Sequence, residues 1–150
     1  MGNISNNDSY SAAHSRIKDM EQLRKNEDSI VFALYCSGVA VECMLKAFSS
    51  EPFDGRHDLL KIFNQSDIGS KLSERKKEEL SLHVKKISKF WRNDFRYYSE
   101  IRMKRLIANE MVHSKGKNIN KYLNKYKNFI FQSSIIIVQI GDIAWKQSKK

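Results

Sequence analysis

The sequence predicts an all-α fold, a single bundle of four or five helices. The chain has 150 residues, a length that fits one domain with a sizeable core. It contains one Pro and six Gly, so residues that break helices are few. Apolar side chains recur at spacings of three and four residues along most of the chain, which is the period of an amphipathic helix. We expect a disordered tail at residues 1–7 and one helical domain at residues 8–147.

The first two helices are predicted by capping residues and by apolar spacing. Asp8 or Ser9 can cap a first helix, whose apolar positions continue through Met20. A second helix should begin near residues 26–28 and end at Phe48. This helix is apolar nearly all round, so we expect it at the centre of the bundle.

Pro52 and Gly55 then interrupt the chain. Further helices are expected at residues 57–64, from a cap at Ser73 to Trp91, from a cap at Ser99 to His113, and at residues 119–145. The β-branched run Ile135–Val138 is also compatible with a strand. We prefer a helix because the helical spacing continues through this run.

Composition bounds the partners and the compartment. The formal net charge of +10 favours attraction to a polyanion such as RNA over a merely solvated surface. Cys36 and Cys43 lie in an apolar stretch and are expected in the core of a cytoplasmic protein, rather than in a disulfide or a metal site. No signal peptide is visible, and Phe129–Trp145 is interrupted by polar residues, so we expect no membrane span.

One stripe of side chains could carry chemistry. Arg102, Arg105, Asn109 and His113 follow each other at helical spacing on the predicted helix 100–113. A histidine can move protons at neutral pH, and an arginine can grip a phosphate through two hydrogen bonds. These are the groups that RNA cleavage without metal would use. The plainer interpretation is that His113 only ends a helix, where a histidine interacts well with the helix dipole.

Several segments extend this pattern over residues 8–145. They are residues 10–23, the small-residue stretch 35–47 with its internal Glu42, His57-Asp58-Leu59-Leu60, Arg96-Tyr97 and Asn109-x-x-x-His113. In order and spacing they resemble the HEPN (higher eukaryotes and prokaryotes nucleotide-binding) domain family. The resemblance implies an all-α homodimer in which two motif helices form one composite ribonuclease cleft.

The family's catalytic arginine and histidine map to positions 108 and 113, with Asn109 as the polar residue after the arginine. Position 108 is Ala, so the resemblance implies an impaired enzyme. Either the arginine was lost naturally or it was replaced to remove toxicity, and the otherwise intact motif favours replacement. Arg105 lies three residues earlier and could reach the cleft.

Other residues receive supporting roles. Arg96, Arg102 and Arg105 are expected to bind RNA, and Glu42 to pair internally, for example with an arginine that it orients. The aromatics between Phe90 and Tyr98 could stack bases or pack between helices, and packing is favoured for Trp91 and Phe95. The histidines lack metal-ligand spacing, so we expect neither a metal nor another cofactor.

The predicted function is a metal-independent endoribonuclease, a toxin or phage-defence effector whose partners are RNA, a second copy of the chain and an antitoxin or defence protein. The alternative is a non-catalytic module that binds RNA or protein on the same dimer. Restoring Arg at position 108 and assaying cleavage would separate the two.

Overall fold

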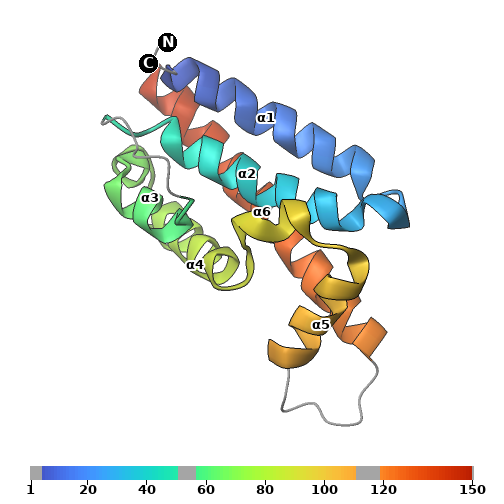
Figure 1. Ribbon diagram of the computed structural model, residues 1–150. Coiled ribbons are helices and arrows are strands. Elements are labelled where there is room, and N and C mark those ends of the chain that lie inside the picture. The colour runs from blue at the N-terminus through green and yellow to red at the C-terminus, as the bar shows by residue number, and fades with distance from the viewer. Residues whose placement is uncertain (1–4, 51–56, 111–118, 150) are drawn as a thin grey trace.

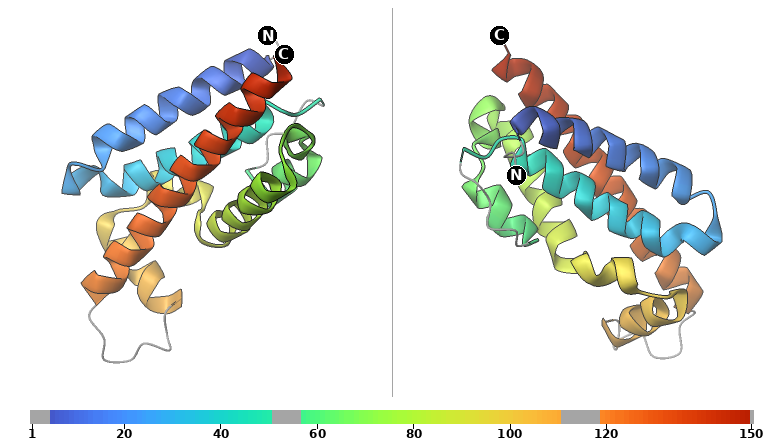
Figure 2. Two further views of the ribbon diagram at one scale, coloured as in Figure 1. Left: turned by 180° about the vertical axis from the view of Figure 1, so that it is seen from behind. Right: turned by 45° about the horizontal axis from the view of Figure 1, so that its top comes forward.

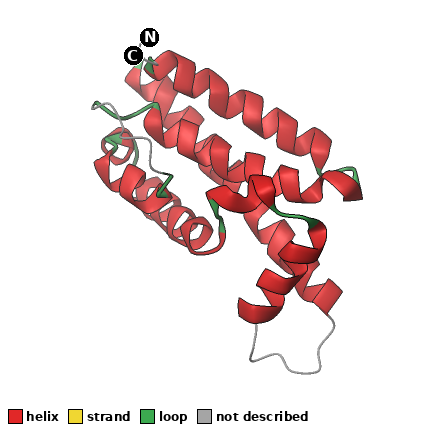
Figure 3. Cartoon of the chain, in the orientation of Figure 1, coloured by secondary structure: helices red, strands yellow, loops and turns green. Residues whose placement is uncertain are grey.

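The computed structural model describes residues 5–50, 57–110 and 119–149. Within these ranges the chain is helical with no strand, which confirms the all-α prediction (Figure 3). The described ranges contain six α-helices rather than four or five, because the two short helices α3 (Leu59–Gln65) and α5 (Glu100–Glu110) add to the four long ones.

Helices α1 (Asn6–Leu23) and α2 (Ile30–Lys46) lie side by side as an antiparallel pair (Figure 1). Ala13 and Met20 on α1 are fully buried, seven residues apart on one face of the helix. Most residues of α2 are buried, as its apolar composition predicts. The prediction that α2 is the central helix is confirmed, since α1, α3, α5 and α6 all contact it.

The start of α1 corrects the prediction. Ser5, rather than Asp8 or Ser9, caps the helix, and Ser5 and Asp8 form a reciprocal capping box. The Ser5 hydroxyl accepts from the Asp8 amide at 3.1 Å, and the Asp8 carboxylate accepts from the Ser5 amide at 3.0 Å. Asp8 is thus the third helical residue, and Asn6 and Asn7, which were assigned to the tail, form the first turn.

The 30-residue helix α6 (Ile119–Ser148) runs diagonally across the bundle and packs on α2 and on α4 (Glu74–Phe90) (Figure 2). It ends three residues beyond the predicted Trp145. The run Ile135–Val138 is helical, so the strand alternative is wrong. Buried residues recur at helical spacing through this run, with Ile130 and Phe131 followed one heptad later by Ile137 and Val138.

Two helical spans, Glu27–Lys46 and Lys121–Ser148, are long and apolar enough to cross a membrane by length and composition alone. The second span contains Phe129–Trp145, the segment that we expected to be too polar to cross a membrane. In the bundle, 61% and 50% of their apolar windows are buried against other helices. Packing in a core accounts for the same composition, so these spans are weak support for membrane insertion.

Side-chain caps set the starts of α3, α4 and α5. Ser73 accepts from the Lys76 amide and Ser99 from the Arg102 amide, so both predicted caps are confirmed. Helix α3 begins two residues later than predicted, because Asp58 is its cap.

The segment after α4 positions α5. Trp91 ends α4 in an extended conformation, and the 3-10 helix η3 (Asn93–Tyr97) packs against α2. Trp91 and Phe95 are buried, which confirms that these two aromatics pack between helices. The Trp91 indole donates to the Leu34 carbonyl at 3.1 Å. This anchor fixes the chain just before α5 begins.

Candidate functional site

Helix α5 carries the predicted site, and its burial pattern defines which face is available. Met103 and Ile107 are buried, at 0% and 2% exposure, and hold one face of α5 against the bundle. Arg102, Arg105 and Asn109 are exposed on the opposite face. Helical spacing also predicts Ile107 on the core side of this helix, and the observed burial agrees with that phase.

Ala108 is exposed on the same side, between Arg105 and Asn109. A side chain longer than alanine at this position would extend into solvent beside the two polar residues. His113, the remaining residue of the predicted stripe, lies outside the described residues, as does Met111, which we expect to face the core. The described part of the site therefore consists of two arginines, an alanine and an asparagine on one helix face.

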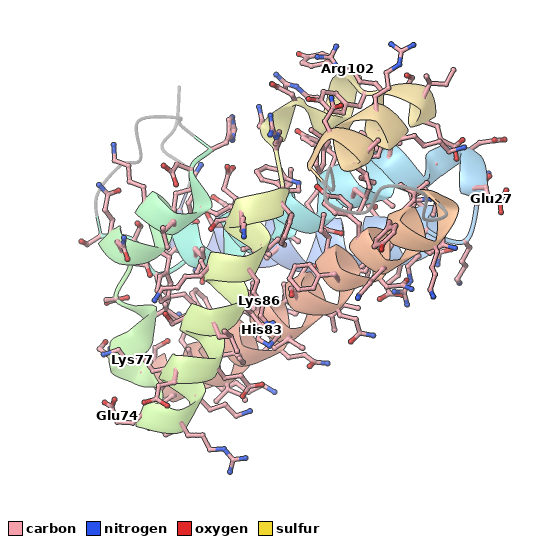
Figure 4. All side chains as sticks on the ribbon, turned by 90° about the horizontal axis from the view of Figure 1, so that it is seen from below. Glu27, Glu74, Lys77, His83, Lys86 and Arg102 are labelled. Atoms are coloured by element: carbon pink, nitrogen blue, oxygen red, sulfur yellow. The ribbon has the colours of Figure 1, made fainter. Side chains whose placement is uncertain are left out.

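Arg102 is held by an aromatic stack that reaches into the core. Its guanidinium lies 4.5 Å from the ring centroid of Tyr98, and Tyr98 packs on the fully buried Phe95 with ring centroids 5.5 Å apart. Cation–π contact and the anchored ring restrict where this charge can go. Arg102 thus projects from the end of the molecule formed by α5 (Figure 4).

Arg96 makes a second pair of this kind. Its guanidinium lies 4.6 Å from the ring centroid of Tyr97, and both side chains are exposed. Trp91 and Phe95 belong to the core, as the sequence favoured, whereas Tyr97 is exposed in the segment just before α5.

Glu42 pairs internally, but its described partners are not arginines. One carboxylate oxygen contacts His57 Nδ1 at 2.6 Å, and the other accepts from Lys46 Nζ at 3.3 Å. Glu42 is buried while His57 is partly exposed, so the carboxylate ties the start of the segment before α3 to α2. The arrangement supports the internal pairing that we expected for Glu42, with a histidine and a lysine in place of an arginine.

A cluster that the sequence did not predict joins α1 to α6. Tyr10 donates to Asp142 Oδ1 at 2.7 Å, and His14 Nε2 contacts the same oxygen at 2.6 Å. The Tyr10 ring stacks on Trp145 with centroids 4.3 Å apart. Burial, followed by the bond to Asp142 and its charge, raises the pKa of Tyr10 to about 12. The sequence offers one signal for this cluster: Tyr10 and His14 are four residues apart and so lie on one face of α1.

His83 forms a further polar contact between α4 and α6. Its Nδ1 lies 3.2 Å from the buried hydroxyl of Ser133, and Lys86 lies one turn away on the same helix (Figure 4). Burial and, to a lesser extent, the charge of Lys86 lower the pKa of His83, while Glu79 opposes the shift. The ring is therefore biased towards its neutral form.

An open cavity of about 360 Å³ lies at the other end of α6 from α5. It is lined by the first turn of α1, the end of α2 and the last turn of α6, and includes none of the predicted site residues.

In the described parts of the chain, no three His, Cys, Asp or Glu side chains gather as a metal site requires. Cys36 and Cys43 are unpaired, and burial raises the pKa of Cys36 to about 11.

The described face of α5 can bind and orient a phosphate. Two guanidinium groups supply fixed positive charge, and Asn109 supplies a neutral donor and acceptor. Neither a guanidinium group nor an amide takes up a proton at neutral pH, so Arg102, Arg105 and Asn109 supply no general base. No family model, curated protein or solved structure matches the chain.

Proposed function

We propose that this chain has the scaffold of a metal-independent endoribonuclease of the HEPN type, with its cleavage site on the exposed face of α5. The observation that carries the proposal is the orientation of that helix. Arg102, Arg105, Ala108 and Asn109 share the solvent face, while Met103 and Ile107 anchor the other. This is the arrangement that a phosphate-binding stripe requires.

The chemistry follows from the groups of the motif. His113 removes the proton from a ribose 2′-hydroxyl, whose oxygen then attacks the adjacent phosphorus. A bond forms between the 2′-oxygen and phosphorus, and the bond to the 5′-oxygen breaks. The leaving 5′-oxygen takes up a proton, so the products are a 2′,3′-cyclic phosphate and a 5′-hydroxyl. Asn109 orients the phosphate.

Position 108 determines the rate of this reaction. A guanidinium there would stabilise the negative charge that develops on the phosphate, and removing such a group costs roughly 10²–10³-fold in rate. With Ala108 we expect binding without efficient cleavage. Arg102 and Arg105 also lie on this face, so cleavage by the present chain would mean that one of them binds the scissile phosphate instead.

The remaining parts of the proposal extend from the resemblance. The active form is a homodimer in which two α5 helices build one cleft, and an isologous two-fold contact is the commonest way for two copies to assemble. Such an enzyme acts in the cytoplasm as a toxin or phage-defence effector, restrained by an antitoxin or a defence partner. The net charge of +10 supports RNA as the substrate.

Ala108 itself favours a second candidate, a module that binds RNA or protein and does not cleave. The two candidates differ in one assay. Ala108→Arg should cleave RNA in the presence of a chelator, whereas Gln139→Arg, which adds the same charge at an exposed position on α6, should not. An Ala108→Arg variant that binds RNA but never cleaves it would support the binding module.

A further inference from the structure

Tyr97 is the most exposed of the large hydrophobic side chains in the described parts of the chain. Its side chain is 73% exposed, whereas the exposed Phe32 reaches 49%. Tyr97 ends η3 and lies three residues before the start of α5. An exposed aromatic ring therefore lies in the segment that leads into α5.

One arginine, Arg96, contacts Tyr97 directly. The Arg96 guanidinium lies 4.6 Å from the Tyr97 ring centroid, close enough for a cation–π contact. Because the ring is still 73% exposed, most of its surface is left to solvent. The neighbouring Arg102 is fixed over Tyr98 at 4.5 Å. One guanidinium thus contacts the exposed Tyr97 ring, and a second is held on the ring of the next residue in the chain.

The buried residues next to Tyr97 hold its backbone in place. Trp91 and Phe95 anchor the segment in the core, and the Tyr98 amide donates to the Phe95 carbonyl at 3.0 Å. Tyr97 adds nothing to that core, because its own side chain points to solvent. The exposed ring is therefore available for a partner at no cost in packing.

We propose that Tyr97 is the stacking platform for one unpaired base of an RNA strand whose phosphates are held by Arg96 and Arg102. This proposal rests on the proposed function, since it assumes that the α5 face binds RNA. A free aromatic ring beside phosphate-binding cations is the pattern of single-strand recognition, because every base offers a π-face. A base within a duplex is already stacked and cannot reach the ring.

The test measures affinity rather than cleavage, so that it is independent of position 108. The full-length chain is titrated at low salt against a fluorescent oligouridylate and against an abasic ribose-phosphate oligomer of the same length. Tyr97→Ala should weaken oligouridylate binding roughly 5- to 150-fold, the range found for losing one stacked base. Tyr97→Phe should restore it, and binding of the abasic oligomer should not change.

Two matched variants separate stacking from charge. Arg96→Gln should weaken binding of both oligomers, because it removes a phosphate contact. Phe32→Ala, which removes an exposed aromatic on α2, should weaken neither. Unchanged melting temperatures check that each variant is folded.

Equal oligouridylate affinity for wild type and Tyr97→Ala would overturn the stacking role while leaving the ribonuclease proposal to the Ala108→Arg assay. Absence of oligouridylate binding by the wild type would also overturn the stacking role of Tyr97. Loss of dimers in Tyr97→Ala with unchanged RNA affinity would assign Tyr97 to a protein interface instead. A result of this kind would also overturn the proposal.

Discussion

The indole of Trp91 occupies the space that a side chain on Gly38 would need. A Cβ atom added to Gly38 would lie 1.8 Å from Trp91 Cε2. The indole cannot easily withdraw, because it is buried and its Nε1 donates to the Leu34 carbonyl on the same helix as Gly38. This contact seats the segment that leads into α5 on the central helix.

Gly38→Ala should therefore destabilise the fold. Overpacking of a filled core costs about 1–3 kcal/mol. A Cβ 1.8 Å from a buried ring argues for the upper end of this range, so the better helix propensity of alanine, worth about 1 kcal/mol, offsets only part of the cost. Urea denaturation measures the difference in the free energy of unfolding.

Gly69→Ala is the matched control. The nearest atom to its added Cβ is Lys77 Cε at 3.1 Å, the end of a flexible side chain that can move away. We expect a change of less than about 1 kcal/mol in either direction. Wild-type stability of Gly38→Ala would contradict the seating of Trp91.

The orientation of α5 is tested by two isoleucines on that helix. Ile107 is 2% exposed and Ile101 is 64% exposed. Ile107→Ala should lower the free energy of unfolding by about 2–4 kcal/mol, because it leaves a cavity. Ile101→Ala should change it by less than about 0.5 kcal/mol. The reverse order in urea denaturation would mean that the arginine stripe faces the core.

Tyr10 should ionise late in an alkaline titration. With a pKa raised from 10.0 to about 12, it should be distinguishable among the six tyrosines by ultraviolet absorbance. The protonated form is favoured in the folded protein. The stability that it contributes is therefore complete below pH 10 and is lost as the pH rises from about 10 to 12.

Asp142→Asn should bring the Tyr10 pKa down towards 10.0 without reaching it, because burial is the larger cause of the shift. Asp94→Asn, at an exposed position on η3, should leave it unchanged. An unaltered titration in Asp142→Asn would show that the bond between Tyr10 and Asp142 does not form in solution.

His83 should titrate below its ordinary pKa of 6.5, mainly because of burial. Its neutral form is favoured in the folded protein, so the associated stability is present above pH 6.5 and lost as the pH falls through the lowered pKa. Lys86→Gln should raise the His83 pKa in an NMR titration, whereas Lys85→Gln should not. A pKa at or above 6.5 in the wild type would contradict the burial of the His83 ring.

The local features of this fold could be predicted from the sequence. Ser73 and Ser99 are caps because each supplies a hydroxyl where a helix begins, and Ile107 is buried because helical spacing requires it. The cap at Ser5 was missed, since Asp8 is an equally good cap in isolation. Only the reciprocal bonds of the capping box decide between them.

Contacts between distant segments could not be predicted. Tyr10 and Asp142 are 132 residues apart, and nothing in either local pattern indicates that α1 and α6 are neighbours. The pairing of Glu42 with His57 likewise depends on how the chain returns to α2 before α3. At the candidate site, sequence spacing predicted the exposed stripe. The sequence also favoured a packed Phe95, but it did not indicate that Tyr97, in the same short 3-10 turn, would be exposed.

The most direct test of the central claim is the rate of RNA cleavage by Ala108→Arg and by Ala108→Arg/His113→Ala, measured side by side in a chelator. The first variant should cleave and leave 2′,3′-cyclic phosphate ends, at roughly 10²–10³ times the rate of the present chain. The second should lose that activity, because no other group on the described face of α5 can take the 2′-hydroxyl proton. Equal rates for the two variants, or no cleavage by either, would contradict the claim.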